Sequence, residues 1–250
     1  MSESQAEYDS IGSRYSEAKT APWRLHLEAY TLEELAGDVS GSRVLDLACG
    51  DGFYSRRLMR RGAVASLGID VSAEMVSLAQ AAEAERPLGC RYIRADVTEA
   101  PLEGDFDLAV AAYLLNYARS REELARLCTA MFTGLRPGGR VVGVNDLTDD
   151  GVELTRDFGR HGFRKTGPRP YVEGGAITYE FVLPEGHSFA ITNYLWHPET
   201  YLTALRKAGF RSAAWHPLKV SPEGRRDFPP GFWDDLLAPG VAIGVFEARR

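Results

Sequence analysis

Short apolar runs alternate with longer amphipathic stretches through the first 148 residues of the chain. The runs are largely aliphatic and are bounded by glycine, proline or polar residues, which is typical of buried strands. They predict strands over residues 43–47, 65–69, 92–97 and 106–110. Because helical patterns separate these runs, we expect an α/β fold whose parallel strands are joined by right-handed crossovers.

Amphipathic periodicity predicts helices before and between these strands. Two helices are expected ahead of the first strand, over residues 5–18 and 22–37, and a third begins near Gly52. Ser72 can cap a fourth. A fifth, over residues 120–135, begins with a serine and a glutamate three positions later, which is the spacing of a capping box.

Beyond residue 148 the pattern changes. Residues 149–175 are polar and show little periodicity, so they predict a lid or an insertion. Two alternating runs, over 176–183 and 188–195, predict a β-hairpin. The remaining expected elements are a helix over 198–208 that ends at Gly209 and two strands near 211–217 and 240–248.

Composition narrows the classes of protein that fit. The chain of 250 residues is 44% hydrophobic and 26% charged, with a net charge of −6 and no run of basic residues. A nucleic-acid partner is therefore not expected, because phosphate backbones need a basic surface. The start resembles no signal peptide and no apolar run is long enough to cross a membrane, so we expect a cytoplasmic protein with a small-molecule substrate. The cysteines Cys49, Cys90 and Cys128 lack zinc-site spacing, and no metal is expected.

The candidate chemistry begins at the first predicted strand. Residues 44–54 read as a buried strand, a glycine-rich turn and the start of a helix. Gly50 and Gly52 permit a tight turn and leave no Cβ in the way of a ligand. The helix would direct its free N–H groups and its positive dipole end at that ligand, which predicts a nucleotide-like guest.

Carboxylates follow three successive strands. Asp46 lies within the first strand, Asp70 closes the second and Asp96 ends the third. Asp70 comes 18 residues after Gly52, since 70 − 52 = 18, and an acidic residue at about this distance is placed to bind ribose hydroxyls. The carboxyl ends of parallel strands share one edge, so these groups are expected to meet there. Asp96 has a second interpretation, in which it only caps the next turn.

This series of motifs resembles the class I S-adenosylmethionine-dependent methyltransferases. The resemblance covers residues 43–148, including the strand at 106–110 and Leu135–Val142, which is similar to the turn that precedes the family's fifth strand. It implies a doubly wound, mostly parallel seven-stranded sheet, a Rossmann-like methyltransferase fold, with an antiparallel C-terminal hairpin and an N-terminal helical lid. S-adenosylmethionine would be the cofactor.

The resemblance also implies an organisation for the whole chain. Residues 1–250 would form a single methyltransferase domain. Its parts would be a helical lid (1–40), a cofactor-binding core (41–148), a substrate-pocket insertion (149–196) and a C-terminal part that completes the sheet (197–250).

The residues expected to contact the cofactor come from the N-terminal segment and from the carboxyl ends of the strands. They are Tyr15, Trp23, Arg24, Asp46, Ala48, Gly50, Gly52, Asp70, Val71, Met75, Asp96, Val97 and Ala112. Arg24 would pair with the methionyl carboxylate, and Val71 and Val97 would flank the adenine ring. Val71 and Val97 fit equally well as core valines.

Two stretches, Leu47–Arg57 and Ala112–Ala118, resemble the toxoflavin-synthase type, which N-methylates a small planar azapteridine. The expected substrate contacts are aromatic and amide side chains that follow strands four and five or the hairpin: Tyr113, Asn116, Tyr117, Asn145 and Trp196. His197 is a candidate proton acceptor, although a histidine beside a proline more often caps a turn. Tyr117 also fits a partly buried helix position.

Four functions remain open from the sequence. The leading one is methylation of a ring nitrogen in a planar heterocycle of secondary metabolism, and the second is O- or C-methylation of another metabolite. A nicotinamide oxidoreductase fits less well, because Ser55 stands where a dinucleotide fingerprint has its third small residue. A cofactor-binding module without catalysis is the fourth. The oligomeric state is not predicted.

Overall fold

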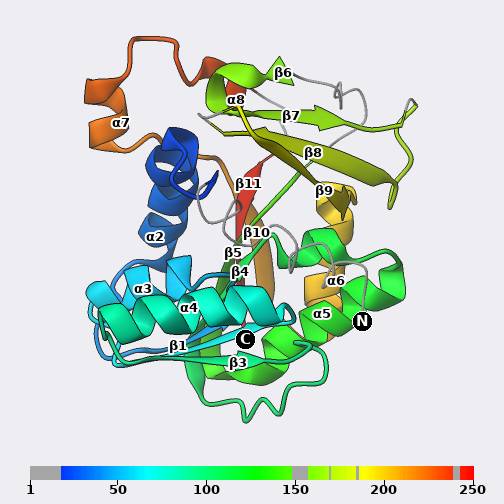
Figure 1. Ribbon diagram of the computed structural model, residues 1–250. Coiled ribbons are helices and arrows are strands. Elements are labelled where there is room, and N and C mark those ends of the chain that lie inside the picture. Colours follow the sequence, from blue (N-terminus) through cyan, green and yellow to red (C-terminus); the bar gives the residue numbers. More distant parts are fainter. Residues whose placement is uncertain (1–17, 148–156, 169, 184–185, 239–242) are drawn as a thin grey trace.

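The computed structural model describes residues 18–147, 157–168, 170–183, 186–238 and 243–250 (Figure 1). Its central sheet contains seven strands in the order β10-β11-β5-β4-β1-β2-β3. Their bounds are Arg43–Leu47 (β1), Ala65–Asp70 (β2), Cys90–Arg94 (β3), Phe106–Ala112 (β4), Leu135–Asn145 (β5), Ser212–His216 (β10) and Gly244–Arg249 (β11). β1 to β5 are parallel, and β11 runs antiparallel to both of its neighbours. The expected α/β fold and its antiparallel closing hairpin are confirmed.

Helices cover both faces of this sheet (Figure 1). One face packs against the π-helical segment Arg24–Ala29 (η1) and against Tyr30–Ala36 (α2), Phe53–Arg60 (α3) and Ala73–Glu85 (α4). The other face packs against Arg121–Gly134 (α5) and Pro198–Ala208 (α6). Residues alternate across a strand, so Val44 of β1 lies in the first layer and Leu45 in the second.

A second, four-stranded antiparallel sheet lies beyond the carboxyl ends of the central strands (Figure 1). It consists of Asp157–Phe158 (β6), Phe163–Thr166 (β7), Ala176–Val182 (β8) and Ser188–Tyr194 (β9). The hairpin expected over residues 176–195 is its β8–β9 pair. The lid or insertion expected over 149–175 contains two strands of this sheet, which were not predicted because each is only two to four residues long. Residues 148–156 lie outside the described ranges.

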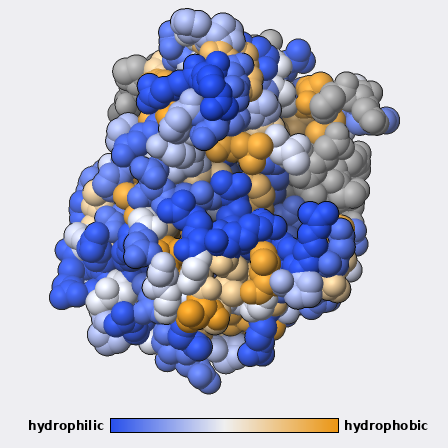
Figure 2. Space-filling model, turned by 90° about the vertical axis from the view of Figure 1, so that its left-hand side faces the viewer, coloured by the Kyte–Doolittle hydropathy of each residue, from blue (hydrophilic) through white to orange (hydrophobic). Residues whose placement is uncertain are grey.

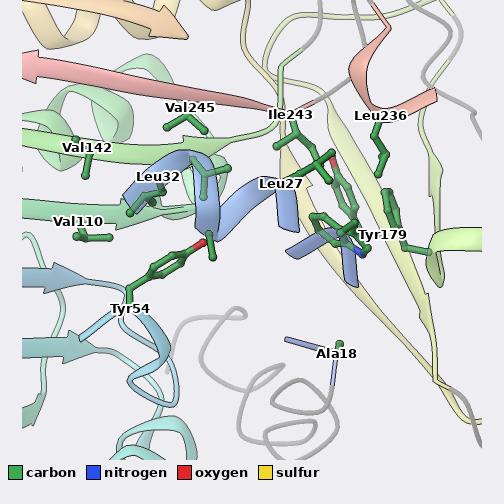
Figure 3. Packing of buried hydrophobic residues seen from close by; sticks show 14 of the residues in the cluster. Ala18, Leu27, Leu32, Tyr54, Val110, Val142, Tyr179, Leu236, Ile243 and Val245 are labelled. Carbon is green, nitrogen blue, oxygen red and sulfur yellow. The ribbon is translucent and has the colours of Figure 1, made fainter. Parts of the chain in front are cut away.

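Buried apolar side chains join the second sheet to the central one. Leu27 and Leu32, from η1 and α2, pack in one cluster with Val110 and Val142 of the central sheet and with Tyr179 of β8 (Figure 3). All five are at most 5% exposed. The N-terminal helices therefore lie between the two sheets and hold them together.

Several element boundaries follow the predicted chemistry. The Ser72 hydroxyl accepts the Met75 N–H at 3.2 Å, and the Ser120 hydroxyl accepts the Glu123 N–H at 3.2 Å, so both expected caps are confirmed. β3 ends at Arg94 rather than at residue 97, because the chain turns at Asp96. The short helices Leu114–Tyr117 (η2), Gly159–His161 (η3), Pro222–Asp227 (α7) and Asp234–Leu237 (α8) were not predicted. The helix expected over 5–18 falls almost entirely outside the described residues.

The face of the molecule in Figure 2 is mainly hydrophilic, with small separate apolar patches. Among the described residues, the large apolar side chains that are exposed lie apart along the chain, at Val64, Val172, Val182 and Leu237. No described helix combines the length and apolar character that a membrane span requires.

Candidate active site

A cavity of about 290 Å³ opens at the carboxyl ends of β1 to β4. Most of the residues expected at the cofactor or substrate line it: Arg24, Ala48, Gly50, Asp70, Val71, Met75, Asp96, Val97, Ala112, Tyr113 and Tyr117. They come from η1, from the ends of β2 and β4, from the turns after β1, β2, β3 and β4, and from α4 and η2. The parallel sheet therefore brings together residues up to 93 positions apart, since 117 − 24 = 93.

The turn after β1 forms one wall of this cavity. Ala48, Gly50 and Gly52 have φ values of 58°, 57° and 80°, a conformation that favours glycine. A Cβ on Gly50 would lie 2.7 Å from Lys19 Nζ, and one on Gly52 would overlap the Tyr92 hydroxyl. Gly52 does not line the cavity itself; it allows the turn to pass Tyr92 and begin α3.

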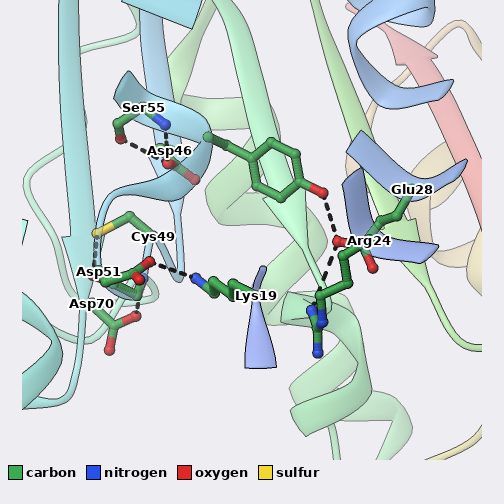
Figure 4. A network of polar contacts seen from close by, with 10 residues as sticks. Lys19, Arg24, Glu28, Asp46, Cys49, Asp51, Ser55 and Asp70 are labelled. Atoms are coloured by element: carbon green, nitrogen blue, oxygen red, sulfur yellow. Dashed lines mark hydrogen bonds and ion pairs between the residues drawn. The ribbon is translucent and has the colours of Figure 1, made fainter. Parts of the chain in front are cut away.

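Asp46 is buried beneath the same turn and is not among the described residues that line the cavity (Figure 4). Its Oδ2 accepts the Ser55 N–H at 2.9 Å and the Ser55 hydroxyl at 2.7 Å, which fixes the first turn of α3. Burial raises the pKa of Asp46 to about 6, against the effect of these hydrogen bonds. Its Oδ1 is buried and accepts no hydrogen bond from the described residues.

Asp70 joins two turns at the cavity wall. Its Oδ2 accepts the Gly50 N–H at 2.8 Å, and its Oδ1 accepts the Ser72 N–H at 2.9 Å. Burial raises the pKa of this carboxyl, while the two N–H donors favour its charged form. Asp70 therefore holds the glycine turn in place in addition to facing the cavity.

Asp96 lies just beyond β3 and lines the cavity near Val97 and Thr98. Its Oδ1 accepts both the N–H and the hydroxyl of Thr98 at 2.8 Å. The turn-capping interpretation of Asp96 is thus confirmed, and its other carboxylate oxygen leaves room for a ligand contact.

The N-terminal segment reaches over the turn from the opposite side. Lys19, a residue that we did not predict, forms an ion pair with Asp51 at 2.9 Å (Figure 4). Trp23 lines two other cavities rather than this one. Its ring lies 4.7 Å from the Arg24 guanidinium carbon. Tyr15 lies outside the described residues.

A buried cluster of polar side chains closes the inner end of the cavity. Glu28 accepts hydrogen bonds from Tyr54 Oη at 2.7 Å and from Tyr113 Oη at 2.5 Å, and Arg24 lies 3.7 Å from the same carboxylate. Burial, followed by the charge of Glu28, raises the pKa of both phenols well above the usual value, so they remain protonated donors. Tyr113 has φ +60°, which is uncommon for a bulky residue and typical of functional sites.

Four further expected site residues, besides Trp23, Asp46 and Gly52, do not line the cavity. Asn116 is buried and exchanges hydrogen bonds with Asp146, and Asn145 is fully buried at the end of β5. Trp196 donates its indole N–H to the Ala118 carbonyl at 3.0 Å. All three side chains are at most 5% exposed and lie away from this cavity.

The fourth is His197, the expected proton acceptor, which lies outside this cavity. It precedes α6 as the N-cap residue, and the edge of its ring packs against Tyr171 at 5.4 Å. Its neighbour Pro198 occupies the first turn of that helix. The His197 side chain makes no capping hydrogen bond to this helix, and its ring is not among the described groups of the cavity wall.

A buried ion pair lies behind the cavity, beneath the second sheet. Lys165 Nζ contacts Asp146 Oδ1 at 2.9 Å, and both side chains are at most 3% exposed. Burial lowers the pKa of Lys165, and Asp146 opposes that shift. The ammonium also lies 4.9 Å from the ring centre of Tyr179.

Sequence reasoning missed Lys19, Glu28, Tyr54 and Lys165. Tyr54 lies in the motif that we used, but its side chain was not considered. Glu28 interrupts an otherwise apolar helical face, which is a signal that a pattern search can detect. Lys165 left no comparable signal, because its partner Asp146 comes directly after a strand of the other sheet.

Comparisons with known proteins agree with this geometry. Residues 44–139 match the family model described as a methyltransferase domain. A curated relative, a ubiquinone biosynthesis O-methyltransferase of Bordetella avium (strain 197N), is 29% identical over 146 residues, which are 55% of this chain and 59% of that protein. The chain thus matches less than two thirds of that relative's length.

Solved structures share the whole fold. An S-adenosylmethionine-dependent methyltransferase from Mesorhizobium loti superposes with a TM-score of 0.63 at 22% identity, covering 93% of this chain and 100% of that one. The [4+2]-cyclase SpnF superposes with a TM-score of 0.64 at 19% identity, covering 99% of this chain and 95% of that one. The chain therefore has the Rossmann-like methyltransferase fold.

Proposed function

We propose that this chain is an S-adenosylmethionine-dependent methyltransferase that acts on a small molecule. The observation that carries the proposal is the cavity beside the left-handed turn at Gly50, with Asp70 on its wall and the methyltransferase family match over the same residues. The curated relative and the Mesorhizobium loti structure have the same activity in their names.

The residues present fit this cofactor. Gly50 presents a surface free of Cβ, and the buried Asp46 Oδ1 offers an acceptor beneath the turn. Asp70 suits the ribose hydroxyls, and Asp96 and Val97 suit the adenine. When bound, the cofactor supplies a methyl group on a positively charged sulfur, which is already activated for transfer. The protein needs to orient the acceptor and exclude water, and orientation alone can contribute about 7–11 kcal/mol.

For the acceptor, we propose a planar heterocycle that is methylated on a ring nitrogen, as in the toxoflavin-synthase type. Tyr113, Tyr117 and Phe53 line the cavity with aromatic surface, which suits a flat ring. O-methylation of a phenol is the second candidate, and the name of the O-methyltransferase relative favours it. The net charge of −6 disfavours a nucleic-acid acceptor.

Calorimetric titration with S-adenosylmethionine and S-adenosylhomocysteine tests the cofactor, and reduced nicotinamide serves as the negative control. Turnover is followed as S-adenosylhomocysteine formed with lumazine, xanthine or 3,4-dihydroxybenzoate, which represent N–H heterocycles and phenols. Binding of reduced nicotinamide without S-adenosylmethionine binding would contradict the proposed function. Turnover of the phenol alone would favour O-methylation.

A further inference from the structure

We propose that Glu28 is the proton acceptor of the methyl transfer, with Tyr113 as the residue that positions it. This inference rests on the proposed function. Methylation of an N–H or O–H acceptor forms a bond to the methyl carbon while the carbon–sulfur electron pair stays on sulfur, so one proton per turnover is released. That proton needs a base at the reacting end of the cavity.

Glu28 is the buried carboxylate placed for this role. It is 2% exposed, yet it lines the main cavity together with Gly50 and Tyr113. Its two oxygens accept hydrogen bonds from phenols on two different elements, Tyr54 of α3 and Tyr113 after β4. It lies on η1, a π-helical segment, and such segments occur frequently at functional sites.

Three groups face the Glu28 carboxylate. Arg24 faces it from the same element at 3.7 Å, while Tyr54 and Tyr113 are held protonated. The charge of Arg57 lowers the pKa of Tyr54, whereas the charge of Asp146 raises the pKa of Tyr113. A proton from the acceptor can reach Glu28 directly or by way of Tyr113 Oη, which would receive it while passing its own proton to Glu28 Oε2.

The other buried carboxylates fit this role less well. Asp70 holds the backbone of the glycine turn and of the Ser72 cap through its two oxygens, and Asp46 lies beneath the glycine turn rather than on the cavity wall. Asp146 is held by Lys165 and Asn116. Glu28 is therefore the candidate that combines burial, access to the cavity and a hydrogen-bonded phenol.

The test compares Glu28→Gln with Glu33→Gln as a matched control. Glu33 is another buried carboxylate, on the neighbouring helix, and it pairs with Arg57 outside the cavity. With lumazine, xanthine and 3,4-dihydroxybenzoate as probes, Glu28→Gln should lower kcat by about 100-fold or more and abolish the fall in rate at acidic pH. Its affinity for S-adenosylhomocysteine should stay within about twofold of the wild type. Glu33→Gln should keep the wild-type pH profile.

A binding measurement gives a second readout that needs no turnover. With S-adenosylhomocysteine bound, the absorbance of 4-nitrocatechol reports its ionisation in the cavity. A negative Glu28 should hold this phenol protonated, so Glu28→Gln should shift the bound probe's titration to lower pH by about one unit or more.

The outcomes separate the two proposals. An unchanged pH profile and an unchanged 4-nitrocatechol titration in Glu28→Gln would overturn the role of Glu28 alone. Absence of turnover with every probe would overturn the acceptor class, and with it this inference. Should Glu28→Gln fail to fold, Glu28→Asp keeps the charge and should retain the acidic fall in rate at a lower kcat; loss of that fall would also overturn the proposal.

Discussion

Two walls of the same cavity are built in different ways. The wall formed by the glycine turn relies on backbone: Gly50 and Ser72 donate N–H groups to Asp70, and left-handed residues shape the surface. The wall formed by η1 relies on side chains, with Glu28 between two phenols, and behind it Lys165 of the second sheet pairs with Asp146. A wall built from backbone suits the proposed cofactor, which is the same in every turnover. A wall built from side chains suits the acceptor, because substitutions there can change which acceptor fits.

Among the substitutions that test this comparison, loss of the buried ion pair should have the largest effect, and that effect is on the free energy of unfolding. Lys165→Met leaves Asp146 as an uncompensated buried charge, so we expect the free energy of unfolding to fall by about 3–5 kcal/mol. Cofactor affinity of the folded protein should not change, because the pair lies behind the cavity and does not line it. Urea unfolding and calorimetry measure the two quantities, with Lys207→Met as the exposed control. A loss below about 1 kcal/mol would show that the second sheet does not depend on this pair.

Asp46 should make stability depend on pH in the absence of cofactor. Because its pKa is raised in the folded state, to about 6, the folded protein holds a proton that the unfolded chain releases above about pH 4. Stability from this group is thus full at low pH and falls as pH rises through 6, by up to about 3 kcal/mol. Urea unfolding at several pH values should show a smaller fall in Asp46→Asn. Parallel curves for the two proteins would show that Asp46 does not titrate in this range.

The proposed ribose contact should be weaker but directly measurable. Asp70→Ala should reduce S-adenosylmethionine affinity by about 1.5–3 kcal/mol, since it removes a charged hydrogen-bond acceptor and frees the Gly50 N–H. Asp96→Ala is the matched control at the next strand, where a smaller loss is expected. Calorimetry compares the two, and an unchanged affinity in Asp70→Ala would show that the backbone turn alone holds the ligand.

The smallest effect is expected at His197. It caps α6 away from the cavity, so His197→Ala should change kcat by less than about twofold and stability by about 0.5 kcal/mol or less. Initial rates over a range of pH provide the measurement. A large loss of kcat would restore this histidine as a candidate proton acceptor.

The difference between the walls also explains what the sequence could predict. The glycine turn, Asp70 and Asp96 lie within one continuous stretch whose strand and turn signals are local, so both their elements and their common edge were predicted. Glu28 and Lys165 depend on contacts with Tyr113 and Asp146, which lie 85 and 19 residues away along the chain. The expected contacts Asn145 and Trp196 were misplaced for the same reason. Proximity to a strand end does not reveal which side chain another sheet will cover.

Two of the buried thiols, those of Cys49 and Cys128, can report local opening of the structure around them. Cys49 lies in the glycine turn and lines the cavity, whereas Cys128 lies on the buried face of α5. Burial raises the pKa of both, so neither reacts until its surroundings open. The rate at which a thiol reagent labels Cys49 therefore measures local opening of the glycine turn. The labelling rate at Cys128 measures separation of α5 from the sheet. A ligand that fills the cavity should lower the labelling rate at Cys49 and leave the labelling rate at Cys128 unchanged.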